Sequence, residues 1–271
     1  MIKGKVAFIG TGNMGGAMLR GAVEKQAAKR ENIYIYDAYE PLVKKLTEEL
    51  GVKAAESESD AAKNADYIIV AVKPDKVAGV WEKISPVCKG KTIISIAAGK
   101  KLADYEGNRD GVKFVRTIPN LPAMVGEGIT GLYFDFDTEK NRETVDDVKE
   151  IFESFGKTIV VEKEEKIDSM ISVTSSSPAY VCLMVEAMAD AAVKAGFKRK
   201  DAYMMAEQAI YGTCAYLMEK EILPAALKDM VCSPGGTTIE AVAVLEKEGF
   251  RAALMDAMQA CEEKNRKLGK K

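Results

Sequence analysis

The sequence predicts an α/β fold in which a helix-wrapped parallel sheet is followed by an all-helical domain. Short apolar runs alternate with helix-like segments over about the first 160 residues, a pattern typical of a parallel sheet covered on both faces. After about residue 163 the strand-like runs stop, and alanine, methionine and leucine dominate. We therefore expect two domains, at residues 1–162 and 163–271.

The expected strands share near-continuous apolar sequence and lie at residues 6–9, 33–36, 67–72, 92–96, 113–117, 129–134 and 158–161. Runs such as Ile68-Ile69-Val70 suit strands that are buried on both faces. Between the early strands, Leu42, Leu46 and Leu50 recur at helical spacing and predict an amphipathic helix.

The second domain is expected to contain helices at residues 177–196, 200–220, 224–231, 238–248 and 251–268, with Gly196 ending the first of them. These segments are rich in small and flexible apolar residues such as Met184, Ala187 and Met188. A unit of this size has a limited core volume. We therefore expect these helices to bury faces against a partner subunit; the alternative is a monomer whose core is lined with alanine.

Bulk composition narrows the function classes. The 39 basic and 41 acidic residues nearly balance, so the net charge does not attract nucleic acid or an anionic membrane. No apolar stretch is long enough to span a bilayer. The five cysteines are odd in number and lack CxxC spacing, which favours reduced thiols, a cytoplasmic protein and no metal site.

The chain contains no histidine. It therefore cannot build a Ser-His-Asp relay or use a histidine as general acid. If the protein is an enzyme, we expect a bound cofactor to perform the difficult step. Reduction of an imine that is already protonated fits this constraint, because the iminium carbon accepts a hydride directly.

A glycine-rich loop follows the first expected strand and consists of Gly10, Thr11, Gly12, Asn13, Met14 and Gly15. In such a GxGxxG loop the glycines permit a tight turn, close backbone approach to a pyrophosphate, and close helix–strand packing. The start of the next helix offers N–H groups to the phosphate. With a strand before it and a helix after it, the loop predicts a Rossmann-like dinucleotide site; the alternative is an ordinary strand–helix turn.

Asp37 stands at the end of the second expected strand. A carboxylate at this place accepts hydrogen bonds from the ribose hydroxyls of NAD and repels a 2′-phosphate. We therefore expect the cofactor to be NADH or NADPH, with Asp37 favouring NADH. The same residue is also suited to capping the helix that begins near Pro41.

A second glycine turn, 233–238 (SPGGTT), lies between two expected helices. Its glycines allow backbone N–H groups to converge at the start of a helix, a geometry that binds a carboxylate. The alternative is a plain helix–helix turn.

Further motifs follow in order: AVKP at 71–74, SIAAG at 95–99, RTIPNLP at 116–122, SPAY at 177–180, LKDMV at 227–231 and SPGGTTIE at 233–240. With the glycine loop, they resemble the pyrroline-5-carboxylate reductase family over nearly the whole chain. The resemblance implies hydride transfer from NADH or NADPH to 1-pyrroline-5-carboxylate, giving L-proline in the last step of proline biosynthesis. It also implies a homodimer interlocked through the helical domain, which in the family often assembles into a homodecamer.

The resemblance also implies site residues. Ala71, Val72, Lys73 and Pro74 would lie along the cofactor, and Asn120 would lie near the substrate. The backbone of Ser233, Gly235, Gly236 and Thr237 would hold the substrate carboxylate, and the Thr238 hydroxyl would contact the ring nitrogen as the catalytic residue.

Three positions depart from the family pattern. Ser175 and Ser177 stand where the family often has glycine, so their side chains would narrow or reshape the pocket. Asp37 differs from the polar or basic residues of NADPH-preferring relatives. Two other classes remain open: a related dehydrogenase or imine reductase that shares the glycine loop, and a protein that binds NAD(H) to regulate a partner without turnover.

Overall fold

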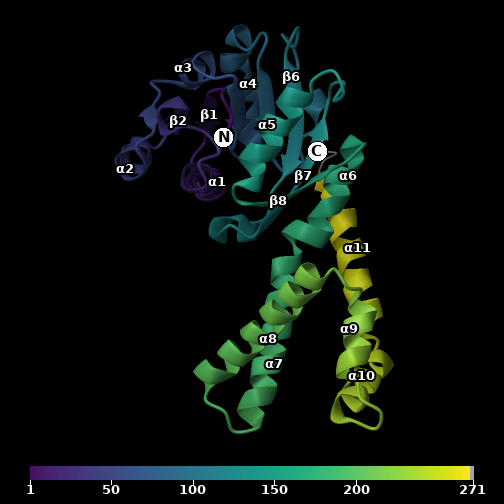
Figure 1. The fold of residues 1–271 in the computed structure, drawn as a ribbon. Coiled ribbons are helices and arrows are strands. Elements are labelled where there is room, and N and C mark those ends of the chain that lie inside the picture. The colour runs from purple at the N-terminus through teal and green to yellow at the C-terminus, as the bar shows by residue number, and fades with distance from the viewer. Residues whose placement is uncertain (269–271) are drawn as a thin grey trace. The chain divides into compact units, whose positions relative to one another are not determined.

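The computed structural model describes residues 1–268, which form two compact units. The first consists of Met1–Ser175 with the described part of Glu262–Lys271, and the second is Ser176–Cys261. Figure 1 shows the strands in the first unit and the long helices of the second. Within the described residues, no helix is both long and apolar enough to cross a membrane.

The sheet of the first unit has eight strands among the described residues, in the order β3-β2-β1-β4-β5-β6-β7-β8. Their bounds are β1 Val6–Ile9, β2 Ile33–Tyr36, β3 Lys53–Ala54, β4 Tyr67–Val70, β5 Thr92–Ser95, β6 Lys113–Ile118, β7 Gly128–Phe134 and β8 Gly156–Val160. All pairs are parallel except β6 with β7. Strand order reverses between β1 and β4, which is the crevice where such sheets bind ligands.

Helices cover both faces of this sheet. Their bounds are α1 Asn13–Glu24, α2 Glu40–Leu50, α3 Glu58–Lys63, α4 Val77–Ile84, α5 Arg142–Glu153 and α6 Glu164–Met170. Side chains alternate along β1: Phe8 packs in one core with Leu46 and Phe152, whereas Ile9 packs in the other with Trp81. The predicted α/β class is thereby confirmed.

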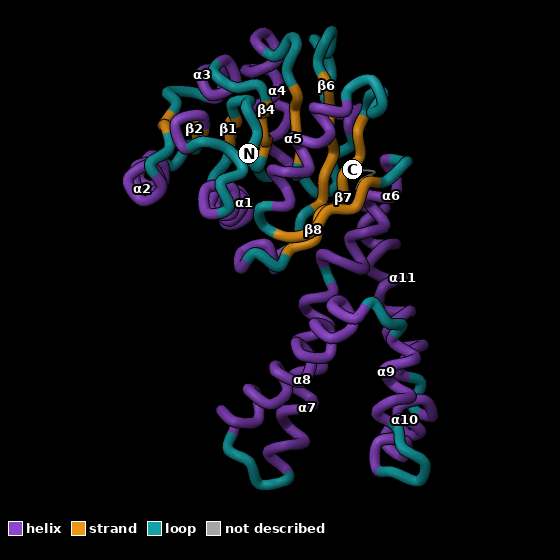
Figure 2. Tube along the Cα trace, in the orientation of Figure 1, coloured by secondary structure: helices purple, strands orange, loops and turns teal. Residues whose placement is uncertain are grey.

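The second unit contains only helices and loops (Figure 2). Its helices are α7 Ser177–Lys194, α8 Arg199–Lys220, α9 Pro224–Val231, α10 Thr237–Lys247 and α11 Phe250–Leu268, the last continuing into the first unit from Glu262. Gly196, with φ +97°, follows the end of α7 as predicted. Among the described residues of this unit, the buried apolar side chains are those of Ala189, Ala202 and Ala206. Large apolar side chains are therefore left exposed in the single chain.

The amino-acid composition changes at about residue 163, whereas the boundary between the two compact units lies after Ser175. The difference arises because α6 packs on the sheet. Ile167 is buried, and Arg116 of β6, only 2% exposed, binds two acids of α6. Its Nη2 lies 2.5 Å from Oδ1 of Asp168, and its Nη1 lies 3.3 Å from Oε1 of Glu164.

Replacing Asp168 by alanine should lower the free energy of unfolding by about 3 kcal/mol, because the Arg116 charge would stay buried without its closest partner. Urea unfolding at fixed protein concentration measures this change. The control is Asp135→Ala, which breaks the partly exposed Arg109–Asp135 pair and should cost below about 1 kcal/mol. Equal losses in the two variants would contradict the assignment.

Candidate functional site

The glycine loop brings three backbone segments together at the end of β1. Gly10 has φ +93°, and a Cβ there would lie 2.6 Å from the carbonyl oxygen of Ala71. A Cβ on Gly15 would overlap the carbonyl oxygen of Gly10. At Gly12, in contrast, a Cβ would meet no atom within 4 Å. Gly10 and Gly15 are therefore needed for packing, while Gly12 borders open space.

Helix α1 begins directly beyond this open space. Gly12 is its N-cap and provides no side chain to occupy the first N–H groups. The first intrahelical bond runs from the Gly16 nitrogen to the Gly12 oxygen, so the amides of Asn13, Met14 and Gly15 stand at the helix start, where such groups lack helical partners. Together with the helix dipole, this arrangement fits a pyrophosphate.

Asp37 is tied to the glycine loop. Its Oδ2 accepts hydrogen bonds from the backbone nitrogen of Thr11 at 2.7 Å and from the Thr11 hydroxyl at 3.2 Å. Its Oδ1 accepts from the backbone nitrogen of Tyr39 at 3.0 Å, and Tyr39 rather than Asp37 is the N-cap residue of α2. A carboxylate has about four acceptor positions, so Oδ1 retains capacity for a ribose hydroxyl.

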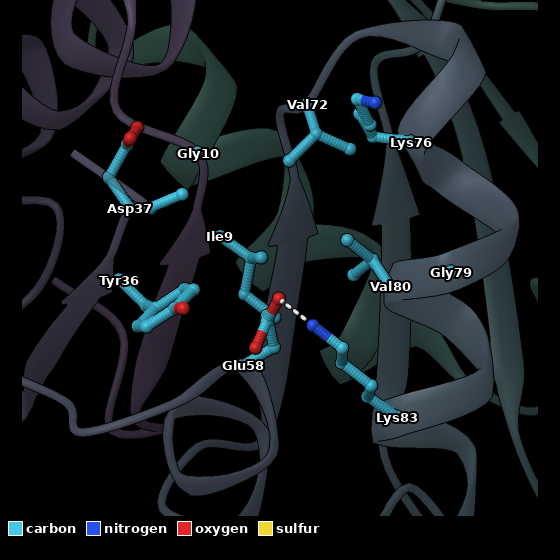
Figure 3. Close-up of a pocket in the computed structure, with 11 residues that line it drawn as sticks. Ile9, Gly10, Tyr36, Asp37, Glu58, Val72, Lys76, Gly79, Val80 and Lys83 are labelled. Atoms are coloured by element: carbon cyan, nitrogen blue, oxygen red, sulfur yellow. Dashed lines mark hydrogen bonds and ion pairs between the residues drawn. The ribbon is translucent and has the colours of Figure 1, made fainter.

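The 71–74 segment follows β4 and borders the same crevice. The Ala71 nitrogen donates to the Ile9 oxygen at 2.8 Å, and Pro74 opens a short 3-10 helix for which Lys73 is the N-cap residue. Val72 lines a cavity of about 300 Å³ together with Gly10 and Asp37 (Figure 3). Lys73 and Pro74 are exposed beside it.

Asn120 is buried and engaged at both ends of its amide. Its Nδ2 donates to the Thr174 oxygen, and its Oδ1 accepts from the Ile129 nitrogen, both at 2.9 Å. Thr174 belongs to a π-helical turn at Ile171–Ser175, where the Ser175 hydroxyl lies 3.5 Å from the Pro119 oxygen. Asn120 therefore holds this turn in place, and a contact with substrate would use its remaining amide hydrogen. Ser177 begins α7.

The second glycine turn lies between α9 and α10. Gly235 has φ +68°, and Gly236 is the N-cap residue of α10 without a side-chain cap. The Gly236 nitrogen donates to the Ser233 oxygen at 3.0 Å, and a Cβ on Gly236 would lie 2.6 Å from Oγ of Ser233. The turn therefore leads directly into a helix start whose amides can bind a carboxylate.

Thr238 lies in the first turn of α10 and lines a cavity of about 620 Å³ within the helical unit. Lys228 of α9 lines the same cavity and pairs with Asp229 at 2.9 Å. The hydrogen bond that Lys228 donates to the Asp229 carboxylate raises the pKa of Lys228, so this side chain is cationic at neutral pH. Lys228 lies in the LKDMV motif, but nothing in the sequence pattern predicted a role for it at the site.

Among the described residues, no group of three or more Cys, Asp or Glu side chains could hold a metal ion.

Comparisons with known proteins cover nearly the whole length of the chain. A family model described as pyrroline-5-carboxylate reductase dimerisation matches residues 164–268, and one described as NADP oxidoreductase coenzyme F420-dependent matches residues 5–99. The pyrroline-5-carboxylate reductase of Escherichia coli (strain K12) is 43% identical, covering 98% of each chain. That of Methanosarcina acetivorans is 36% identical, again covering 98% of each.

The chain belongs to the pyrroline-5-carboxylate reductase family. The family resemblance and the predicted class of NAD(P)-dependent oxidoreductase are thereby confirmed. Two solved pyrroline-5-carboxylate reductases have the same fold. The structure from Coxiella burnetii has a TM-score of 0.93 at 28% identity and covers 98% of this chain and 99% of that one. The Plasmodium falciparum enzyme, solved with NADP bound, has a TM-score of 0.83 at 30% identity and covers 99% of each.

Gly12 and Gly15 should respond differently to alanine. Gly15→Ala should lower both the free energy of unfolding and the affinity for NADH, because the new Cβ collides with Gly10. Gly12→Ala should leave stability nearly unchanged and still weaken NADH binding about tenfold or more, because its methyl group would occupy the space beside the phosphate.

Thermal unfolding and calorimetric titration with NADH check this pair of variants. Unchanged affinity in Gly12→Ala would contradict the assignment of the open space to the pyrophosphate.

Proposed function

We propose that this chain reduces 1-pyrroline-5-carboxylate to L-proline with a dinucleotide held at the glycine loop and the imine held at residues 233–238. The observation that carries this proposal is the open helix start at Gly12, which lies between Gly10 and Gly15, where a Cβ would collide with backbone carbonyls. When bound, the reduced nicotinamide supplies the hydride.

The protein's own task is to bind and orient the substrate. Because the chain has no histidine, the ring nitrogen receives its proton before reaction, and positioning supplies the catalytic advantage. The Thr238 hydroxyl contacts this nitrogen and fixes the ring. The amides at Gly235, Gly236 and Thr237 hold the substrate carboxylate, and the positive charge of Lys228 favours its entry.

Asn120 acts here mainly as a positioning residue. Its side chain fixes the π-helical turn at Ile171–Ser175, the segment in which Ser175 replaces a family glycine. Val72, Lys73 and Pro74 border the cofactor beside Ala71, since they follow β4 at the same crevice.

The active form is proposed to be a homodimer, which assembles further into a decamer. Support comes from the match to the family's dimerisation model and from the exposed apolar side chains of the helical unit, Leu183, Met204, Met230 and Met255 among them. Light scattering during size exclusion measures the assembly.

Five free thiols support a reducing compartment, the cytoplasm, as the place of action.

The assay that tests the proposed reaction follows the near-ultraviolet absorbance of each reduced cofactor with pyrroline-5-carboxylate as substrate. The proposal predicts cofactor oxidation with stoichiometric formation of proline. Turnover of 2-hydroxy acids instead would indicate a related dehydrogenase. Tight NADH binding without oxidation by any cyclic imine would indicate a nucleotide sensor.

NADH is the proposed preferred cofactor, because the Asp37 carboxylate stands where the adenosine ribose is expected and repels a 2′-phosphate. Asp37→Asn removes this charge while keeping the shape of the side chain. The ratio of kcat/KM for NADH to that for NADPH should fall about tenfold, which corresponds to about 1.4 kcal/mol.

The matched control is Glu40→Gln, which removes an exposed acid at the start of the adjacent α2. An equal change in both variants would indicate a general charge effect and not recognition by Asp37.

Thr238→Ala should lower kcat with pyrroline-5-carboxylate about tenfold, as expected for the loss of one positioned hydrogen bond. Affinity for NADH should stay unchanged. Thr238→Ser retains a hydroxyl and should recover most of the activity. Steady-state kinetics of the wild-type protein, Thr238→Ala and Thr238→Ser measure these changes. Full activity in Thr238→Ala would contradict a role for Thr238 in the mechanism.

A further inference from the structure

The cavity beside Asp37 has apolar walls and a polar end that the reaction does not use. Ile9, Val72 and Val80 supply apolar side chains, and Gly79 leaves the wall beside them open, since a Cβ there would meet no atom within 4 Å. In Figure 3, Asp37 lies at the upper left of the lining residues, whereas Glu58 lies below Ile9 and faces Lys83. The volume of about 300 Å³ is at the small end of ligand pockets and suits part of a dinucleotide.

The polar end is an ion pair between two helices. Oε1 of Glu58 on α3 accepts a hydrogen bond from Nζ of Lys83 on α4 at 2.7 Å. The Glu58 side chain is only 13% exposed, whereas that of Lys83 is 59% exposed. Within residues 1–268, no hydrogen bond reaches the second oxygen of Glu58, so the lysine fixes the carboxylate and leaves one acceptor atom available.

A purine base fits this combination of surfaces. If Asp37 binds the adenosine ribose, as the proposed function requires, the attached base extends along the adjoining cavity. Its flat faces would contact Ile9, Val72 and Val80, and its polar edge would reach the far end. Adenine carries the N6 amino donor on that edge, whereas hypoxanthine or guanine carries the O6 acceptor in its place.

We propose that Glu58 recognises the exocyclic amino group of the cofactor's adenine, and that Lys83 is a positioning residue that orients the Glu58 carboxylate. The free oxygen of Glu58 accepts a hydrogen bond from N6 of adenine. With hypoxanthine, the same oxygen would face a second acceptor in a largely buried place, which is unfavourable. The inference rests on the proposed function and adds base specificity to it.

The test compares NADH with reduced nicotinamide hypoxanthine dinucleotide by calorimetric titration of the full chain. Wild-type protein should bind NADH about tenfold more tightly than the hypoxanthine analogue. In Glu58→Ala the two dissociation constants should become nearly equal, chiefly because NADH binds more weakly. Lys83→Met should lower the preference in part, since the carboxylate loses its support.

Glu49→Gln is the matched control, because it breaks another ion pair between two helices, Arg20 of α1 with Glu49 of α2 at 2.8 Å. This variant should keep the wild-type preference. Two results would overturn the inference: equal affinity of the wild-type protein for both dinucleotides, or a Glu58→Ala variant that binds both more weakly at an unchanged ratio. Cofactor oxidation by wild-type protein with pyrroline-5-carboxylate tests the proposed function separately.

Discussion

The backbone of the glycine loop lies so close to the end of β4 that side chains are excluded at Gly10 and Gly15. The carbonyl of Ala71 occupies the place of a Cβ on Gly10, and the carbonyl of Gly10 occupies the place of one on Gly15. This contact directs the first turn of α1 into the crevice where strand order reverses. The Thr11–Asp37 hydrogen bonds then fix the end of β2 to the same loop, so the packing of this backbone positions both the proposed phosphate site and the proposed ribose site.

The absence of histidine and the presence of two glycine turns together determine which chemistry the chain can support. Without histidine, and with a substrate that carries its own proton, binding and orientation become the main requirements. The two glycine turns share one structural feature. In each, a glycine is the N-cap residue of the following helix, Gly12 for α1 and Gly236 for α10, and no side chain caps the helix start. Lys228, which pairs with Asp229, lines the cavity that contains Thr238, and we propose that its charge favours entry of an anionic substrate.

Much of the fold could be predicted from the sequence because its strands are continuous apolar runs and its helices have clear ends. The predicted α9 agrees with the structure at both ends, and the other helices of the second unit agree within two residues. Strand β3 was missed because it has only two residues, Lys53 and Ala54, and both are exposed. Neither apolar pattern nor length distinguishes such a segment from a loop.

The polar contacts were less predictable, because they join residues that are distant in sequence. Arg116 is a charge inside an apolar strand, and its partner Asp168 lies 52 positions away. Glu58 and Lys83 are 25 positions apart and appear in sequence as ordinary surface charges. Only the packing of α3, α4 and α6 on the sheet brings these groups together.

We propose that the two glycine turns hold the cofactor and the substrate for direct hydride transfer. A crystal structure of the assembled protein with NAD⁺ and L-proline tests it most directly. We expect the pyrophosphate on the amides that follow Gly12, the proline carboxylate on the amides of residues 235–237, and the proline ring facing the nicotinamide. Residues 233–238 lying away from the nicotinamide in every copy of the assembly would contradict the account.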